Sequence, residues 1–133
     1  MTKATLNTNA QAVLTVVKDA GNHPTALDVY EAAKKIRPRI GLASVYRILH
    51  TLVKQGRIKE ISHIDGTYRY DGLIERHDHG ICTKCGTLID VPVEIDLPQA
   101  ILESAAKSTG IVLSFYELRL YGICTSCYQN TMK

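Results

Sequence analysis

The chain has 133 residues, a formal net charge of +3 and a hydrophobic content of 45%, which fits one folded domain or two small ones. No apolar run approaches the ~18 residues that a membrane span requires, and the N-terminus lacks the apolar core of a signal peptide. The composition therefore excludes membrane proteins and predicts a cytoplasmic protein that has no membrane partner.

The charge is unevenly distributed along the chain. Residues 1–72 hold 11 Lys/Arg against 6 Asp/Glu, a net of +5, whereas residues 73–133 hold 5 against 7, a net of −2. Eight basic residues and no acidic residue occur between Ala32 and Lys59. This asymmetry suits a polyanionic partner for the first half, although a solvated basic face would have the same charge.

Two helices are predicted in the first forty residues. The first spans Thr8–Ala20, where apolar residues recur at helical spacing. The second begins at Thr25, because Thr25 and Asp28 have the spacing of a capping box, and it continues to about Ile36. The side of this second helix that we expect to face the core consists of Leu27, Val29, Tyr30, Ala33 and Ile36.

A third predicted helix, within residues 41–57, has two distinct faces. Its apolar face is expected to be buried and consists of Leu42, Val45, Ile48, Leu49, Leu52 and Val53. Its polar face is expected to contact DNA through Ser44, Tyr46, Arg47, Thr51 and Lys54. An ordinary amphipathic helix is the alternative interpretation of this pattern.

Residues 58–63 and 67–70 alternate in polarity around Asp65-Gly66, which is a strong hairpin signal. Three helices followed by a hairpin is the order of elements in a winged helix-turn-helix domain. The basic stretch without acids, together with Arg69 in the hairpin, favours DNA as the partner of this domain.

The second half is predicted to be a small α+β unit. It comprises two strands within Ile81–Val91, a helix over Leu97–Ser108 and a strand over Ile111–Tyr121. A unit of about 50–60 residues has a limited core, so we expect a metal site and dimerisation to stabilise it. The predicted fold class is therefore α+β, with an N-terminal winged-helix DNA-binding domain (1–72), a small C-terminal α/β dimerisation domain (73–133) and a hinge at about 71–80.

The four cysteines form two C-x-x-C pairs, Cys82–Cys85 and Cys124–Cys127, and 38 residues separate the pairs. Four thiolates in this pattern suit one tetrahedral Zn²⁺, and a site closed by four sulfurs has a structural role. The alternatives are two redox-active pairs or buried free cysteines.

A second candidate metal site lies just before the first cysteine pair. In an extended segment His77 and His79 point the same way, and Asp71, Glu75 and Asp90 are nearby carboxylates. Imidazole and carboxylate ligands without sulfur suit Fe²⁺ or Mn²⁺. The alternative is a polar surface strand. His23, which precedes Pro24, is by itself more typical of a polar residue at a helix start.

Four segments of the chain resemble the ferric uptake regulator family. They are HPTALDVYEAAKK (23–35), GLASVYRILHTLVKQGRIKEI (41–61), RYDGLIERHDHGICTKCGTLID (69–90) and YELRLYGICTSC (116–127). Their order and spacing match the family from about Asn9 to Tyr128. The resemblance implies a homodimeric repressor that binds a palindromic operator in double-stranded DNA, is not an enzyme and takes no small organic substrate.

The same resemblance assigns a regulatory Fe²⁺ or Mn²⁺ to five ligands: His23, Asp71, His77, His79 and Asp90. The aspartates at positions 71 and 90 resemble the peroxide-stress branch, since iron-sensing members tend to carry glutamates there. In that branch Fe²⁺ reduces hydrogen peroxide and oxygen is added to a ligand imidazole, here matching His77 and His23, after which ion and DNA are released. An iron-responsive repressor is the main alternative, followed by a zinc, manganese or nickel sensor.

The sequence differs from other family members at three points, and each difference predicts a feature that this chain lacks. Only about eight residues precede the first helix, so contacts from an additional N-terminal helix are expected to be missing. Where some members hold a further metal ion, the matching positions are Arg76, Leu97 and Tyr116, so no such site is expected here. A fifth cysteine, which zinc sensors use, is absent.

An enzyme is a further alternative, because two histidines and an aspartate resemble the iron site of non-haem oxygenases. His77, His79 and Asp90 are the residues that would form this triad. An enzyme would need a substrate pocket, which no feature of the sequence indicates, and the basic helix would have no purpose in it.

Overall fold

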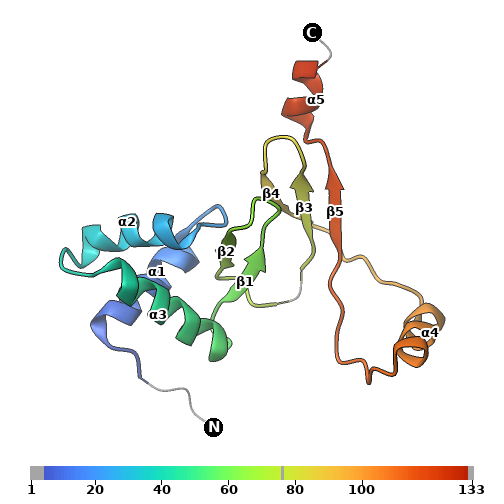
Figure 1. The fold of residues 1–133 in the computed structure, drawn as a ribbon, viewed down its shortest axis with the longest axis horizontal. Helices are drawn as coiled ribbons and strands as arrows, with labels where there is room; N and C mark the ends of the chain where they lie inside the picture. The colour runs from blue at the N-terminus through green and yellow to red at the C-terminus, as the bar shows by residue number, and fades with distance from the viewer. Residues whose placement is uncertain (1–4, 76, 132–133) are drawn as a thin grey trace. The chain divides into compact units, whose positions relative to one another are not determined.

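The computed structural model describes residues 5–75 and 77–131. The chain divides into an N-terminal unit, Met1–Glu75, and a C-terminal unit, Arg76–Lys133. Helices and small sheets make up both units, which confirms the α+β class (Figure 1). None of the helices in the described ranges is both long and apolar enough to cross a membrane.

The N-terminal unit packs three helices against a two-stranded hairpin. Thr25 accepts the backbone N–H of Asp28 and Asp28 accepts that of Thr25, so the predicted capping box is confirmed. Gly66, with φ +87, allows the tight turn of the hairpin, whose strands are antiparallel. The elements are α1 (Thr8–Asp19), α2 (Ala26–Ile36), α3 (Leu42–Lys54), β1 (Lys59–Ser62) and β2 (Tyr68–Asp71).

One hydrophobic core holds this unit together. It consists of Val13, Val17, Ala26, Val29, Ala33, Ile40, Val45, Leu49, Leu52, Ile58 and Tyr70. The predicted core sides of α2 and α3 were wrong for Leu27, Ile36 and Leu42, which are 51%, 52% and 38% exposed. On α2, Ala26 packs into the hydrophobic core instead. Because Leu27 lies about 100° further around the helix axis than Ala26, its side chain points away from the core. Ile36 and Leu42 are terminal residues of their helices, where the chain leaves the core.

Gly72 lies against the backbone of α1. A Cβ atom at Gly72 would be 2.8 Å from the Cα atom of Lys18. We therefore expect Gly72→Ala to lower the free energy of unfolding by about 1–3 kcal/mol, because backbone atoms must move apart. Urea denaturation would measure this effect. Gly21→Ala is the control, since a Cβ at Gly21 meets nothing within 4 Å; equal stabilities of the two variants would contradict the prediction.

The C-terminal unit is built on a three-stranded sheet with the order β4-β3-β5. β3 pairs with β4 antiparallel and with β5 parallel (Figure 1). Among its described residues, the buried hydrophobic side chains are those of Ile81 and Cys82, so its core is small. The elements are β3 (His79–Cys82), β4 (Leu88–Asp90), α4 (Gln99–Thr109), β5 (Arg119–Gly122) and α5 (Thr125–Thr131).

The predicted strand over Ile111–Tyr121 was wrong in most of its length. Only Arg119–Gly122 forms a strand, because each of the four residues of β3 pairs with one residue of β5. The preceding apolar residues are exposed, Val112 to 94% and Phe115 to 73%. The sequence prediction also missed α5, which follows the second cysteine pair.

Candidate metal centres and DNA-binding helix

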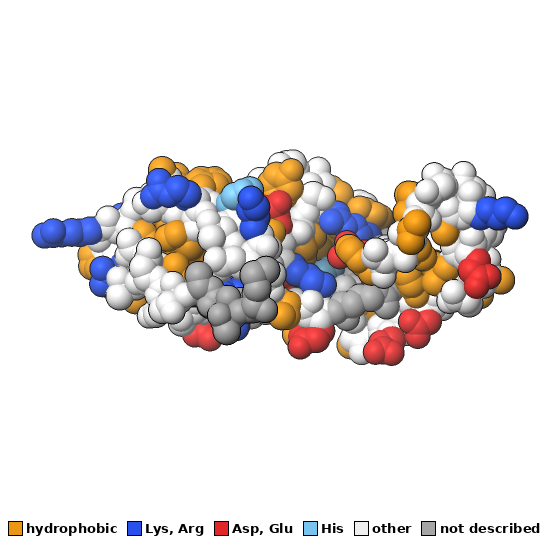
Figure 2. Space-filling view, turned by 90° about the horizontal axis from the view of Figure 1, so that it is seen from below, with side chains coloured by type: hydrophobic (Ala, Val, Ile, Leu, Met, Phe, Trp, Pro, Cys, Tyr) orange, Lys and Arg blue, Asp and Glu red, His pale blue; other side chains and the backbone are white. Residues whose placement is uncertain are grey.

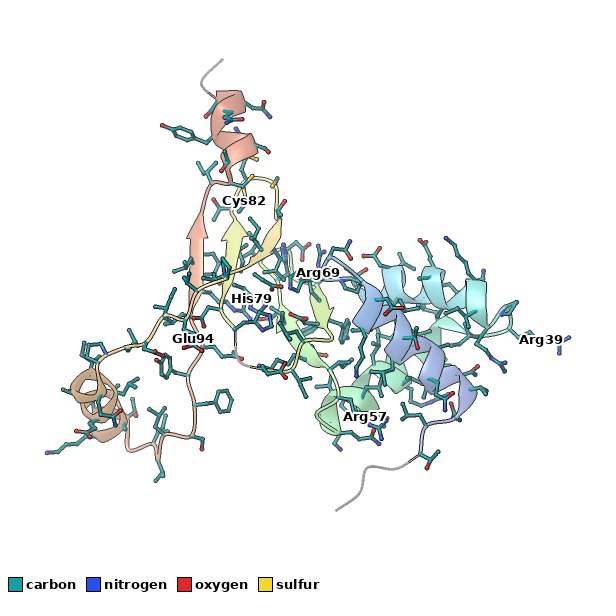
Figure 3. The ribbon with its side chains drawn as sticks, turned by 180° about the vertical axis from the view of Figure 1, so that it is seen from behind. Arg39, Arg57, Arg69, His79, Cys82 and Glu94 are labelled. Carbon is teal, nitrogen blue, oxygen red and sulfur yellow. The ribbon has the colours of Figure 1, made fainter. Side chains whose placement is uncertain are left out.

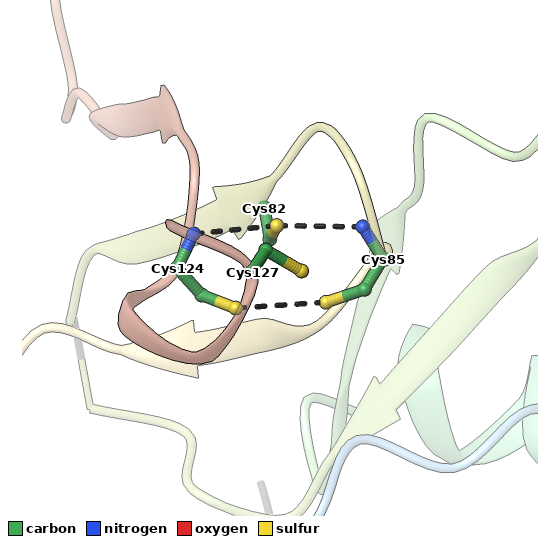
Figure 4. Close-up of side chains that lie close together, drawn as sticks. All are labelled: Cys82, Cys85, Cys124 and Cys127. Atoms are coloured by element: carbon green, nitrogen blue, oxygen red, sulfur yellow. Dashed lines mark hydrogen bonds between the residues drawn. The ribbon is translucent and has the colours of Figure 1, made fainter. Parts of the chain in front are cut away.

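The four cysteines lie together at one end of the sheet in the C-terminal unit (Figure 4). β3 ends at Cys82, Cys85 lies in the turn that follows, and Cys124 and Cys127 lie between β5 and the first turns of α5. Their sulfur atoms are all within 4.8 Å of one another. Within the described residues all four are free thiols, so each sulfur could bind a metal ion.

Hydrogen bonds to two of these sulfurs, those of Cys82 and Cys85, favour the thiolate form. Cys82 Sγ accepts the N–H groups of Cys124 (3.3 Å) and Cys85 (3.4 Å). These bonds lower the pKa of Cys82 to about 5, and the Thr87 hydroxyl, 2.9 Å from Cys85 Sγ, lowers the pKa of Cys85. By contrast, Cys124 and the other sulfurs raise the pKa of Cys127 to about 12. A bound cation would reverse that effect, because it attracts the thiolate charge that the neighbouring sulfurs repel.

The sulfur spacing fits zinc. A Zn–S bond of about 2.3 Å places two sulfurs of a tetrahedron about 3.8 Å apart. Cys85 Sγ and Cys124 Sγ are 3.8 Å apart. With all four sulfurs within 4.8 Å of one another, the cluster suits a closed structural Zn²⁺ site, which leaves no ligand position for a substrate.

A second cluster in the C-terminal unit joins His77, His79 and Asp90. The antiparallel register places Asp90 on β4 directly opposite His79 on β3. His77 precedes His79 by two residues, so both imidazoles face the same side, with ring centroids 4.5 Å apart. Asp90 Oδ1 lies 3.1 Å from His77 Nε2 and 3.2 Å from His79 Nε2. Atoms about 2.1 Å from one ion and at right angles are about 3 Å apart, so this cluster fits a divalent metal ion.

His23 and Asp71 form a similar pair within the N-terminal unit. His23 Nε2 is 3.2 Å from Asp71 Oδ2, and each residue is only 9% exposed. Asp71 Oδ1 accepts the N–H of Leu73 at 2.9 Å, which orients the carboxylate. A buried imidazole and a buried carboxylate at this distance could each offer a lone pair to a metal ion. Glu75, which the sequence analysis named as a nearby acid, is exposed.

The candidate DNA-contacting residues lie on α3. Tyr46, Arg47, Thr51 and Lys54 are exposed, and Ser44 is half-buried. Arg47 Nη2 donates to Ser44 Oγ at 3.2 Å and the Thr51 hydroxyl donates to the Arg47 carbonyl at 3.0 Å. The opposite side of α3 buries Val45, Leu49 and Leu52. The helix therefore presents a polar and basic surface suited to a major groove.

Sequence analysis missed the role of Asp78, which lies between the two histidines. Its side chain is 2% exposed, and its carboxylate accepts the N–H of Leu118 at 3.1 Å. Asp78 thereby joins the residue that precedes β3 to the residue that precedes β5. Successive side chains in an extended segment point to opposite faces, so Asp78 must face away from His77 and His79. This alternation is the signal that could have indicated a buried carboxylate at Asp78.

Two of the three positions that match a further metal site, Leu97 and Tyr116, lie in the described part of the chain. Leu97 has an aliphatic side chain, and its backbone N–H donates to the Tyr116 hydroxyl at 3.0 Å. Arg76 lies outside the described residues. The expectation that the chain has no such site stays a prediction.

Three comparisons place these features among known proteins. A model of the ferric uptake regulator family matches residues 2–121. The peroxide operon regulator of Bacillus subtilis is 33% identical over 118 residues, covering 87% of this chain and 79% of that protein. The solved peroxide stress regulator of Campylobacter jejuni is 31% identical, with a TM-score of 0.73 over 90% of this chain and 88% of the other. The ferric uptake regulator of Francisella tularensis, solved with iron, is 25% identical, with a TM-score of 0.73 over 96% and 98%.

Proposed function

The chain belongs to the ferric uptake regulator family, and we propose that it is a metal-dependent transcriptional repressor that senses hydrogen peroxide. Its similarity to the peroxide regulators of Bacillus subtilis and Campylobacter jejuni supports this function. The structural observation that carries it is the placement of His77 and His79 around Asp90, which suits Fe²⁺ or Mn²⁺. The family is one of transcriptional regulators, and such a protein would act in the cytoplasm on chromosomal DNA.

Two ions with different roles are proposed for each chain. Zn²⁺ would be held by Cys82, Cys85, Cys124 and Cys127 and would stabilise the small C-terminal unit. The regulatory Fe²⁺ or Mn²⁺ would be held by His23, Asp71, His77, His79 and Asp90. Bound Fe²⁺ would supply the redox chemistry that cleaves the O–O bond of hydrogen peroxide. One oxygen atom would be added to the imidazole of His77 or His23, which is thereby oxidised, and the other would leave as water.

The regulatory ion would control DNA binding by linkage. His23 and Asp71 belong to the N-terminal unit, whereas the three other ligands belong to the C-terminal unit. An ion bound by both sets would favour one arrangement of the two units. If that arrangement binds DNA better, the ion shifts the population toward it and DNA in turn raises the affinity for the ion.

A homodimer is proposed because the C-terminal unit exposes many apolar side chains. Figure 2 shows hydrophobic side chains on the surface of this unit, in the right half of the view. The exposed apolar side chains of this unit include those of Val93, Ile101, Ile111, Val112, Phe115, Tyr121 and Tyr128. A second copy would bury this surface, and the paired N-terminal units could then reach palindromic half-sites about one helical turn apart.

Phe115→Glu is expected to dissociate this dimer. A carboxylate buried in the interface without a partner costs several kcal/mol. Because about 1.4 kcal/mol corresponds to a factor of ten in a dissociation constant, we expect the dissociation constant of the dimer to rise by about 100-fold or more. Sedimentation equilibrium would measure the change. Leu27→Glu is the matched control, because Leu27 is an exposed leucine of the N-terminal unit. A Phe115→Glu protein as dimeric as the control would exclude this surface.

The proposed function is tested by gel shift on a palindromic A/T-rich duplex, with and without Mn²⁺. We expect Mn²⁺ to increase the DNA affinity of the wild type. Asp90→Ala should lose this response because Asp90 approaches both histidines, whereas Glu94→Ala, an exposed acid nearby, should keep it. A wild type that ignores Mn²⁺ and Fe²⁺ would refute a metal-dependent repressor.

A further inference from the structure

Arg69 joins the turn of the β1–β2 hairpin to the segment that contains His23. Its side chain extends from β2 (Figure 3) and is 26% exposed. Nη2 lies 3.3 Å from Asp65 Oδ2 in the hairpin turn. Nη1 donates to the backbone carbonyl of His23 at 3.3 Å. One guanidinium therefore bridges two segments that are 42 residues apart in sequence, at Asp65 and His23.

At the hairpin end, Asp65 organises the turn itself. Its Oδ1 atom accepts the backbone N–H of Thr67 at 2.9 Å and the Thr67 hydroxyl at 2.5 Å. His63 Nδ1 lies 3.0 Å from the same oxygen. The hydrogen bonds from Thr67, with a smaller contribution from Arg69, hold the pKa of Asp65 below its usual range, so it stays a carboxylate at neutral pH. The conformation of the turn and the position of Arg69 thus depend on one another.

At the other end, the backbone around His23 is fastened to β2. The Tyr70 N–H donates to the Pro24 carbonyl at 2.9 Å. The His23 imidazole faces Asp71 at 3.2 Å. Together with the bond from Arg69, three consecutive residues of β2 therefore hold the His23–Pro24 segment. A movement of His23 would be passed directly to Arg69 through the carbonyl that Arg69 binds.

We propose that Arg69 is a positioning residue that transmits ion binding at His23 to the hairpin turn, the part of a winged helix that lies beside DNA. This inference rests on the proposed function, because it takes His23 as a ligand of the regulatory ion. An ion that fixes His23 would also fix its carbonyl, and through Arg69 and Asp65 the orientation of the turn. The planar guanidinium offers two donors in a fixed fork, which an ammonium group does not.

A direct phosphate contact by Arg69 is the competing explanation, and two conservative variants separate it from the bridge. Arg69→Lys keeps the positive charge but offers a single nitrogen, which is not expected to reach both acceptors. Asp65→Asn keeps an oxygen for the Thr67 N–H but replaces the acceptor that faces Arg69 with an NH₂ group. Lys54→Ala, which removes an exposed cation from the candidate DNA-contacting face of α3, outside this bridge, is the control for charge.

The experiment measures DNA affinity of the full-length protein with Mn²⁺ and with a chelator, and takes the ratio as the metal response. Couplings of this kind are typically about 5–150-fold. We expect Arg69→Lys and Asp65→Asn each to reduce the ratio by about 5-fold or more, with little change in the metal-free affinity. Lys54→Ala should instead weaken binding equally in both states and lower the salt dependence by about one charge.

Other outcomes would overturn the inference. If Arg69 contacts phosphate, Arg69→Lys will behave as the wild type, and Asp65→Asn will strengthen binding in both states because it removes a negative charge. If the variants unfold at lower temperature yet keep the wild-type ratio, Arg69 has only a structural role. A wild type without a metal response would instead overturn the proposed function together with this inference.

Discussion

Hydrogen peroxide is expected to release the iron-loaded protein from its operator and to leave the manganese-loaded protein bound. The reason lies in His77, whose Nε2 atom is 3.1 Å from Asp90. An imidazole that has gained oxygen is a poorer ligand. Mutation of a residue that only hydrogen-bonds to a metal ligand already lowers metal affinity by about 10–100-fold. Oxidation of a ligand itself should therefore lower the affinity for the ion by at least as much. A gel shift before and after a small peroxide dose measures the release.

Peptide mass spectrometry locates the oxidation. Peptides with His77 or His23 should gain the mass of one oxygen atom, only in the iron-loaded protein. His50, which is exposed on α3, and His63, in the hairpin, are internal controls that should not change. If oxidation is confined to the cysteines, the histidine mechanism is wrong. If both metal forms bind DNA and ignore peroxide, the protein senses the level of metal rather than peroxide and the argument from Asp71 and Asp90 fails.

The second large effect is expected for Cys124→Ser, which should unfold the C-terminal unit and abolish the dimer. This unit has few buried apolar side chains, so its own core cannot compensate for a lost ion. Structural zinc contributes an apparent binding free energy of about 10–16 kcal/mol at pH 7, whereas whole domains are stable by only about 5–15 kcal/mol. Elemental analysis, circular dichroism and sedimentation would show loss of zinc, structure and dimer together.

Ser126→Ala is the matched control for this variant. Ser126 lies between Cys124 and Cys127 and is exposed, so its loss should leave the zinc content and the dimer unchanged. A Cys124→Ser protein that keeps one zinc per chain and its dimeric state would show that the four cysteines are not a structural zinc site.

Local patterns in the sequence predicted the helices and the hairpin of the N-terminal unit well. The Thr25–Asp28 box, the Asp65-Gly66 turn and the apolar stripe of α3 each depend on neighbours within a few residues. The paired cysteines also indicated their cluster, because thiolates in this spacing have few other uses. These are features in which chemistry close in sequence decides the structure.

Features that depend on distant segments were predicted poorly. Residues 111–118 have strand-like composition, yet β5 begins only at Arg119, because strand length depends on the partner β3. His23 was ambiguous on its own, since only the folded N-terminal unit brings it to Asp71. The bridge through Arg69 gave no sequence signal, because Asp65 and His23 are far apart in the chain.

β3 carries a proposed ligand of each metal ion, His79 at its start and Cys82 at its end (Figure 3). Three residue steps of about 3.3 Å separate them, or about 10 Å. The strand needs its neighbours β4 and β5, and the cysteine cluster fastens the ends of both to it. Maturation of the protein would therefore follow a fixed order, zinc before the regulatory ion. A cell starved of zinc would make a chain that cannot sense peroxide, however much iron it contains.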